Sequence, residues 1–411
     1  MTNFPSEWRI VSVGDVVSGL KSGLSRKLSP SDIGLPVLRS NNLMNGGGVD
    51  YTDIKYWYVD DPQGAKTENY VLRDDDLLIN FINSISAIGK ASIYSNLLGR
   101  DVIYTTNIMC LRVKRKSIIP QYFLYLTQTQ EYDKYIQAIT KPAVNQASFT
   151  TVDFKHWEFP LPPLPEQRKI AQILGTWDEA IATTEKLIAA LERRKRGLMQ
   201  RLLTGQVRKK WQTAQLSEVS QVILSGVDKK TREDDTPVRL CNYTDVFYNA
   251  YITDSMPFME ATATQREIEK CTLLEDDVII TKDSETVAEI AQAATVSESM
   301  RNVICGYHLA IIRPNPELVS GPFLRELIMT PDIHYQFEKS ANGVTRFGLT
   351  GSAIESVEVI FPSLERQKEI VDVLRTNDRE VDLLRSYREQ LETQKKGLMQ
   401  RLLTGQVRVA G

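Results

Sequence analysis

The stretch GLMQRLLTGQVR, residues 197–208, occurs a second time, letter for letter, at residues 397–408 of this 411-residue chain. A run of this length does not recur by chance, and internal self-similarity indicates a duplicated architecture. Short matches at nearly the same offset continue on either side of it. Trp8 corresponds to Trp211, and residues 75–79 (DDLLI) correspond to residues 276–280 (DDVII). The duplicated unit is therefore the unit of both fold and function.

The first copy of the repeat closes a segment with a helical pattern. Pro162, Pro163 and Pro165 suit a helix start, and Glu166 suits the positive end of the helix dipole. Seam residues then recur at alternating steps of four and three, which is the spacing of a coiled coil. The seam comprises Ile170, Leu174, Trp177, Ile181, Thr184, Ile188, Leu191, Lys195, Leu198 and Leu202. The helix should end at Thr204 and Gly205, where glycine suits a left-handed C-cap.

A second helix is expected from about 364 to 403, with each seam position 200 residues after its counterpart. This seam comprises Ile370, Leu374, Asn377, Val381, Leu384, Arg388, Leu391, Lys395, Leu398 and Leu402. Polar seam residues cost stability but fix register and partner. Because the outer faces are too polar for core helices, the seam of each helix needs a partner to pack against. The other copy is the simplest one, in an antiparallel coiled coil with a pseudo-two-fold axis.

Two globules of mixed α/β character precede the helices, so the predicted fold class is α+β. The predicted domains are residues 1–161, a helix within 162–208, residues 209–361 and a helix within 362–411. In the first globule, β-rich runs are expected at 9–13, 35–38, 77–82, 91–94 and 108–113, and a helix at 121–137. The frameworks of the two globules correspond while the residues between diverge, which indicates one fold with two binding specificities.

Several classes of function are excluded by what the sequence lacks. No apolar run approaches the roughly 20 residues of a membrane span, and the N-terminus has no signal-peptide pattern, so a soluble cytoplasmic protein is expected. The four cysteines form no CxxC pair, which favours buried thiols over a metal site. The lysine of Gly89-Lys90-Ala91 lacks the context of a phosphate-binding loop. We expect neither catalytic residues nor a bound metal in this chain.

The charge distribution limits how the chain could bind nucleic acid. Residues 162–208 carry a net charge of +4, whereas residues 209–361 carry 14 basic and 23 acidic residues, a net charge of −9. Because phosphate contacts dominate affinity for DNA, the chain alone should bind DNA weakly and depend on partners. The polar loop 282–286 (KDSET) could reach base edges, or it could be a solvated turn.

The two variable globules, each followed by a near-identical long helix, resemble the DNA-specificity subunit of type I restriction-modification systems. The resemblance covers the whole chain. It rests on the Pro-Leu-x-x-Gln opening at 162–167 and 362–367, the heptad seam and the GLMQRLLTG close. The second opening departs from the first at Ser363, Glu365 and Arg366.

The resemblance implies a non-catalytic subunit whose two target-recognition domains each read half of a bipartite, asymmetric DNA site. The helices would set the spacer and dock two methyltransferase subunits. S-adenosylmethionine would belong to those partners, and ATP and magnesium to two possible restriction subunits. The alternative from another class is a coiled-coil scaffold that joins two protein partners without touching double-stranded DNA, which the acidic second globule favours.

Candidate base readers are polar residues in the expected loops and strands. In the first globule they are Lys21, Arg39, Asn41, Asn42, Ser84, Lys90, Asn145 and Gln146. In the second they are Lys229, Arg239, Asn242, Tyr243, Lys282, Ser284, Thr345 and Arg346. Candidate contacts to the partner subunits lie in the repeat, at helix positions expected to face outward: Met199, Gln200, Arg201, Met399, Gln400 and Arg401.

Overall fold

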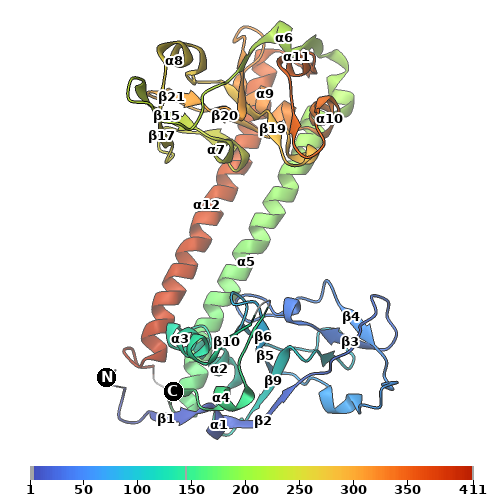
Figure 1. Ribbon diagram of the computed structural model, residues 1–411, viewed down its shortest axis with the longest axis vertical. Helices are drawn as coiled ribbons and strands as arrows, with labels where there is room; N and C mark the ends of the chain where they lie inside the picture. The colour runs from blue at the N-terminus through green and yellow to red at the C-terminus, as the bar shows by residue number, and fades with distance from the viewer. Residues whose placement is uncertain (1–3, 144–145, 410–411) are drawn as a thin grey trace. The chain divides into compact units, whose positions relative to one another are not determined.

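The computed structural model describes residues 4–143 and 146–409 (Figure 1). The chain forms two compact units, one made of Met1–Thr184 with Tyr387–Gly411 and the other of Glu185–Ser386. Both boundaries fall inside the long helices, so each unit contains one globule and a part of both helices. None of the helices in the described residues is long and apolar enough to cross a membrane.

The first unit contains a four-stranded sheet in the order β2-β9-β5-β7 and smaller sheets β4-β3-β8, β10-β11-β6 and β1-β12. Its strands are β1 (Arg9–Ser12), β2 (Val17–Ser22), β3 (Leu35–Leu38), β4 (Lys55–Trp57), β5 (Leu77–Asn80), β6 (Ile82–Asn83), β7 (Ala91–Ile93), β8 (Ile103–Tyr104), β9 (Ile108–Val113), β10 (Lys141–Pro142), β11 (Ala147–Ser148) and β12 (Glu158–Leu161). Its helices are α1 (Val13–Val16), α2 (Pro120–Leu126), α3 (Gln130–Ile139), α4 (Thr151–Lys155) and the 3-10 turns η1 (Ser40–Asn42) and η2 (Thr67–Tyr70).

The second unit repeats this plan with a main sheet of five strands in the order β14-β22-β18-β20-β16, beside sheets β17-β15-β21, β13-β24 and β19-β23. Its strands are β13 (Gln212–Gln215), β14 (Ser220–Leu224), β15 (Thr236–Cys241), β16 (Tyr251–Ile252), β17 (Met259–Ala263), β18 (Val278–Thr281), β19 (Asp283–Ser284), β20 (Ala293–Val296), β21 (Val303–Cys305), β22 (Leu309–Pro314), β23 (Phe347–Gly348) and β24 (Glu358–Phe361). Its helices are η3 (Gly205–Lys210), α6 (Leu216–Val219), α7 (Tyr243–Phe247), α8 (Gln265–Cys271), η4 (Val287–Glu289), α9 (Gly321–Ile328), α10 (Pro331–Ser340) and α11 (Gly351–Glu355).

The expected mixed α/β globules and their main strands are confirmed, but the single helix expected at 121–137 is wrong. The chain forms α2 and α3 there, separated at Thr127–Thr129. The Thr127 hydroxyl donates to the Leu124 carbonyl at 2.6 Å, and the Thr129 hydroxyl accepts from the Tyr132 N–H at 3.3 Å. Threonine hydroxyls that bond the local backbone compete with a continuous helix, and here they cap a new one.

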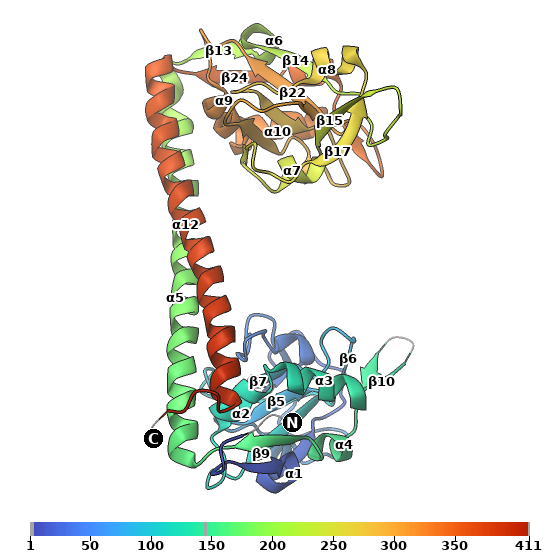
Figure 2. The ribbon, with the colours of Figure 1, turned by 90° about the vertical axis from the view of Figure 1, so that its left-hand side faces the viewer.

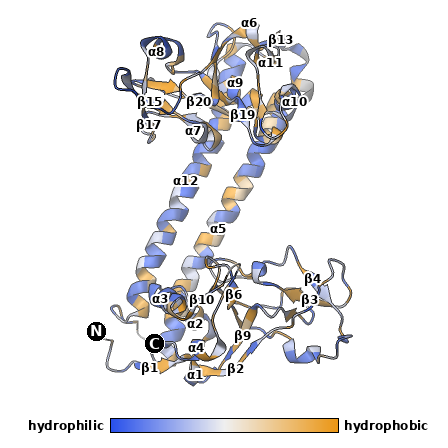
Figure 3. Ribbon diagram, in the orientation of Figure 1, coloured by the Kyte–Doolittle hydropathy of each residue, from blue (hydrophilic) through white to orange (hydrophobic). Residues whose placement is uncertain are grey.

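The two long helices, α5 (Leu164–Leu203) and α12 (Leu364–Leu403), have the bounds expected from the repeat. Their pairing is antiparallel within each unit. In the first unit Lys395 Nζ lies 2.5 Å from Asp178 Oδ1, and in the second Lys195 Nζ lies 2.7 Å from Asp378 Oδ2. Residues along the seam are buried or half-buried, whereas the outer faces are hydrophilic (Figure 3). The antiparallel coiled coil is therefore confirmed.

A buried glutamine explains the Pro-Leu-x-x-Gln opening of each helix. Gln167 is 0% exposed; its Nε2 donates to the carbonyls of Ser117 and Pro162, and its Oε1 accepts from the Ile119 N–H at 2.9 Å. Gln367 makes the matching bonds in the second unit, to Leu318, Pro362 and Ser320. A buried amide with its donors and acceptor satisfied ties the helix start to the segment that precedes α2 or α9.

The repeated stretch at the helix ends packs into the globules. Met399, Leu402 and Leu403 lie in the core of the first unit, together with Ile170 near the start of α5. Figure 2 shows the C-terminal end of α12 beside the first globule. Leu203 occupies the corresponding core of the second unit, with Leu198 and Leu202 packed against it. The left-handed cap is confirmed at Gly405, with φ of 72°, whereas in the first copy residues 205–210 form a 3-10 helix. The four cysteines are buried, as expected.

Candidate nucleic-acid interface

Polar side chains of the second unit gather where the central strand β18 leaves the sheet. β18 is fully buried through Thr281, and the chain then continues into the short strand β19, which pairs with β23. The Lys282 N–H donates to the His308 carbonyl at 3.0 Å, and the Leu349 N–H donates to the Lys282 carbonyl at 2.7 Å. These backbone bonds bring three segments that are far apart in the sequence to one place.

Asp283 lies at the centre of this gathering. Its Oδ1 is 2.7 Å from His308 Nδ1 and 3.2 Å from Arg346 Nη2. The Asp283 side chain is 17% exposed, whereas that of Arg346 is 60% exposed. The carboxylate is thus largely covered, and the guanidinium that it holds faces outward.

Aromatic and basic residues flank the carboxylate. Lys282 Nζ donates to the Ser225 carbonyl at 3.0 Å and lies 4.4 Å from the centre of the Tyr307 ring. Burial lowers the pKa of Lys282, and the neighbouring Asp283 opposes that shift. Tyr243 and Tyr307 line a small pocket together with Asp228, Lys229, Asn242, Gly306 and His308. Basic and aromatic groups beside hydrogen-bonding residues are typical of nucleic-acid interfaces.

Six of the eight candidates in the second globule belong to this gathering or its pocket. They are Lys229, Asn242, Tyr243, Lys282, Ser284 and Arg346. Thr345 adjoins Arg346 and is exposed. Arg239 lies elsewhere, where its guanidinium pairs with Asp254 and donates to the Arg301 carbonyl at 2.7 Å.

The candidates of the first globule are less concentrated. Ser84 and Gln146 are exposed beside β6 and β11, which pair as β19 and β23 do, and Lys90 is half-buried before β7. Lys21 is exposed over the Tyr70 ring, at 3.9 Å from its centre, and Asn41 is exposed in η1. Asn145 lies outside the described residues.

Two candidates of the first globule are engaged in the framework. Arg39 Nη2 bonds Asp53 at 2.5 Å, as Arg239 bonds Asp254 in the second unit. Asn42 is 1% exposed, and its amide donates to the carbonyls of Asp50 and Asp53. The Arg39 pair recurs in both units, so it supports the fold that they share and cannot by itself distinguish two targets.

The sequence did not single out Asp283, Tyr307 or His308 as individual candidates. Asp283 was noted only as part of the loop 282–286, and the local pattern around His308 is that of a strand start. A histidine directly before the apolar run of β22 was the available signal. Its partner Asp283 lies 25 residues earlier, so only the pairing of β18 with β22 reveals the contact.

One expectation about the helix repeat is wrong. Met399 was expected to face outward, but its side chain is 7% exposed and lies in the core of the first unit. Met199 is half-buried against the core of the second unit. Arg201, Arg401 and Gln200 are exposed, and Gln400 is half-buried.

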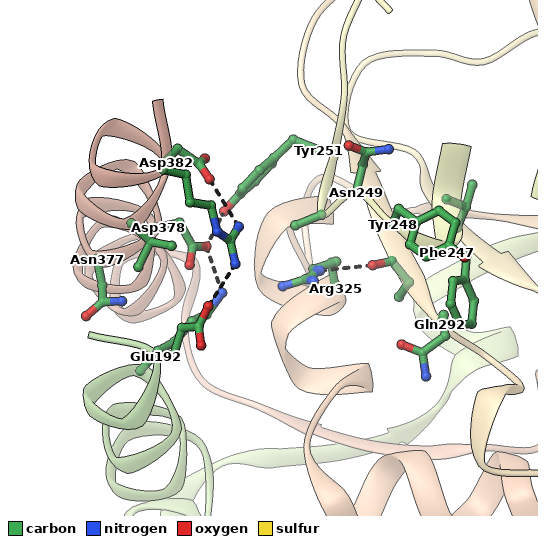
Figure 4. Close-up of a pocket in the computed structure, with 16 residues that line it drawn as sticks. Glu192, Phe247, Tyr248, Asn249, Tyr251, Gln292, Arg325, Asn377, Asp378 and Asp382 are labelled. Atoms are coloured by element: carbon green, nitrogen blue, oxygen red, sulfur yellow. Dashed lines mark hydrogen bonds and ion pairs between the residues drawn. The ribbon is translucent and has the colours of Figure 1, made fainter. Parts of the chain in front are cut away.

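A second polar pocket lies between the helix pair and α7 in the second unit (Figure 4). Its charges compensate one another: Arg385 bonds Glu192 at 2.8 Å, and Lys195 bonds Asp378. The Tyr251 hydroxyl lies 3.2 Å from the same Asp378, and burial raises the pKa of this tyrosine above its usual value. Such internal pairing suits a junction between helix and globule better than a phosphate site.

Comparison with known proteins agrees with a chain of two repeated units. The profile of the type I restriction modification DNA specificity domain matches residues 5–193 and 208–393. A putative type I restriction enzyme MjaX specificity subunit of Methanocaldococcus jannaschii is 29% identical over 98% of this chain and 95% of its own length. The MjaVIII specificity subunit of the same organism is 21% identical over 98% of this chain and 94% of its own length.

Solved structures show the same fold. The S subunit of a type I restriction-modification system from M. genitalium aligns with a TM-score of 0.59 and 13% identity, over 98% of this chain and 97% of its own. A chain from a study of complex assembly in a type I system aligns with a TM-score of 0.57 and 18% identity, over 98% and 100%. The specificity-domain profile and the two whole-length specificity subunits favour DNA sequence recognition over the scaffold alternative. With two copies of the matching domain and whole-length relatives, this chain belongs to the family of type I restriction-modification DNA specificity subunits.

Proposed function

We propose that this chain selects the DNA sequence for a type I restriction-modification complex, with each globule reading one half of a bipartite, asymmetric site. The observation that carries the proposal is one backbone framework with different chemistry at matched positions. β6 pairs with β11 as β19 pairs with β23, yet Ile82 stands where the second unit has Asp283. Two globules of one fold with different polar groups suit two different half-sites.

The chain acts in this proposal without catalysis of its own. Methylation belongs to two methyltransferase subunits that carry S-adenosylmethionine. Cleavage and ATP-driven translocation, with magnesium, belong to restriction subunits where these are present. The second globule carries a net charge of −9, so in this proposal the partner subunits provide the basic surface that phosphate binding needs. DNA affinity depends on neutralised phosphates, so the assembled complex should bind far more tightly than the chain alone.

The exposed residues of the repeat support a place for the methyltransferase subunits. Arg201 and Arg401 are exposed at equivalent positions of α5 and α12. Equivalent surfaces are what two copies of one partner require. Substituting both as Arg201→Glu and Arg401→Glu should weaken complex formation in size-exclusion chromatography without a change in thermal unfolding. Arg379→Glu, on an exposed position of α12 outside the repeat, is the matched control and should leave assembly intact.

Methylation mapping tests the proposal as a whole. A host that expresses this chain with its methyltransferase subunit should carry methylated adenine in one bipartite motif with a fixed spacer. That motif should vanish when this chain is omitted. Methylation that persists unchanged without the chain would contradict the proposal.

Two engineered chains separate the roles of globule and helix. Exchanging residues 209–361 for the corresponding domain of a relative should change one half-site and leave the other intact. Inserting an equal coiled-coil segment into α5 and α12 should lengthen the spacer and leave both half-sites unchanged. Altered half-sites in the insertion variant would count against helices that set the spacer.

A further inference from the structure

The guanidinium of Arg346 is held by one edge and open along the rest. Its Nη2 lies 3.2 Å from Asp283 Oδ1, and among the described residues its Nε and Nη1 have no bonding partner. Arginine has five N–H donors in a planar fork, so most of them face solvent here. An oriented fork with unused donors is suited to a planar acceptor pair on a ligand.

His308 fixes the carboxylate that holds this arginine. The 2.7 Å contact between His308 Nδ1 and Asp283 Oδ1 requires the proton on Nδ1, because an ionised carboxylate only accepts. Arg346 Nη2 also lies 3.4 Å from the same Nδ1, but a nitrogen that already carries its proton cannot accept a second donor. The order of support therefore runs from His308 to Asp283 to Arg346.

Stability does not account for this triad. An ion pair with a 60% exposed arginine contributes little to folding in water. The first unit, moreover, builds the same strand pair without it. When the two strand pairs are aligned by their registers, Ile82 corresponds to Asp283 and Gln146 corresponds to Arg346. Asn107 corresponds to His308, because each directly precedes the equivalent strand, β9 or β22. All three members are replaced together while the backbone arrangement remains.

Cations concentrate at this point of an otherwise acidic globule. Lys229 lines the same pocket as Tyr307 and His308, and Lys282 Nζ lies 4.4 Å from the centre of the Tyr307 ring. In the major groove, guanine presents two acceptors, O6 and N7, that match an arginine fork, whereas glutamine matches adenine.

We propose that Arg346, oriented by Asp283 and His308, recognises a guanine in the half-site read by the second globule. Gln146 occupies the matching position in the first globule, and it reads a different base in the other half-site. This inference rests on the proposed function, and it names one recognised base and the residue that recognises it. Asp283 and His308 are positioning residues, because they act through Arg346.

The experiment compares Arg346→Gln, Arg346→Lys and Asp283→Asn in the complex with the methyltransferase subunit. Binding to a DNA library randomised over both half-sites, together with methylation mapping, reports each base position. Arg346→Gln should lose about 10- to 100-fold of the preference for guanine at one position. Arg346→Lys should lose the preference while keeping affinity, because lysine has charge without the fork. Asp283→Asn should weaken the preference at the same position by a smaller factor.

Gln146→Ala is the matched control, and it should alter the other half-site alone. Because Arg346 is exposed, its variants should unfold at the same temperature as the wild-type protein. Equal unfolding temperatures exclude misfolding as the cause of a lost base preference. An unchanged motif in Arg346→Gln overturns the inference and leaves the proposed function intact. The inference is also overturned if Arg346→Gln weakens binding equally on all DNA sequences and lowers the slope of affinity against salt by about one. That result identifies a contact to a backbone phosphate. If the wild-type complex shows no bipartite motif, the proposed function itself fails.

Discussion

Lys195 on α5 and Asp378 on α12 form an ion pair of 2.7 Å, and Lys395 and Asp178 form its duplicate at 2.5 Å. Each lysine is one of the polar residues that the sequence places in the seam, and each pairs with a carboxylate on the opposite helix. The surroundings of the two pairs differ, because Lys195 also lies 3.7 Å from Glu326, whose side chain is 3% exposed, whereas Lys395 lies 3.5 Å from the Gln128 amide oxygen. The lysine of the second unit thus has a buried carboxylate as its additional neighbour, and the lysine of the first unit has a neutral amide.

This difference predicts unequal costs for removing the two lysines. Lys195→Met should lower the free energy of unfolding by about 3 kcal/mol, because it removes a cation from two carboxylates, one of them deeply buried. Lys395→Met should cost less, because it leaves only the Asp178 carboxylate without its cation, and that side chain is 36% exposed to water. Urea denaturation of both variants measures the difference, and equal costs would contradict it.

The buried glutamines at the helix starts should be intolerant of substitution. Gln367→Leu strands the Ser320 N–H and two carbonyls in the protein interior. Since each unsatisfied buried group costs about 1–3 kcal/mol, we expect the free energy of unfolding to fall by roughly 3 kcal/mol. Gln172→Leu, on the exposed face of α5, is the control and should shift stability by less than about 0.5 kcal/mol. Thermal unfolding followed by circular dichroism compares them.

The carboxylate of Asp61 predicts a pH dependence in the first globule. It accepts bonds from Arg26, from the Trp57 indole and from the Gln63 and Ala65 N–H groups. The Arg26 guanidinium is the main reason that the pKa of Asp61 lies well below its ordinary value of 3.8. A depressed folded-state pKa adds stability above pH 3.8, and this stability is lost as the pH falls through the folded value.

The matching experiment measures Asp61→Asn against the wild-type protein between pH 7 and pH 2. The variant should be less stable at neutral pH, and the two unfolding curves should converge in the acidic range. A difference in stability that stays constant down to pH 2 would show that ionisation of Asp61 is not responsible.

Met399 provides a test of how the repeat is used. Because this side chain is 7% exposed in the core of the first unit, Met399→Ala should lower the free energy of unfolding by about 2–4 kcal/mol. Met199→Ala should cost less, since Met199 is only half-buried. Tryptophan fluorescence during urea unfolding compares the pair. A stable Met399→Ala protein that fails to assemble would instead favour a partner contact.

The sequence by itself determined the duplication, the bounds of α5 and α12 and their antiparallel partnership. These features depend on local periodicity, capping and identity between copies, all of which are readable along the chain. It also placed Lys282, Ser284 and Arg346 among the candidates, because turn and strand patterns show where polar side chains follow a buried strand.

Only the tertiary structure decided which of these residues meet. His308 and Arg346 reach Asp283 across 25 and 63 positions of sequence, and the pairing of β18 with β22 and of β19 with β23 creates that proximity. Burial is likewise a property of the packed core. Identical Met199 and Met399 sit in identical stretches, yet different surroundings bury them to different degrees, because a side chain's exposure depends on what the rest of the chain packs against it.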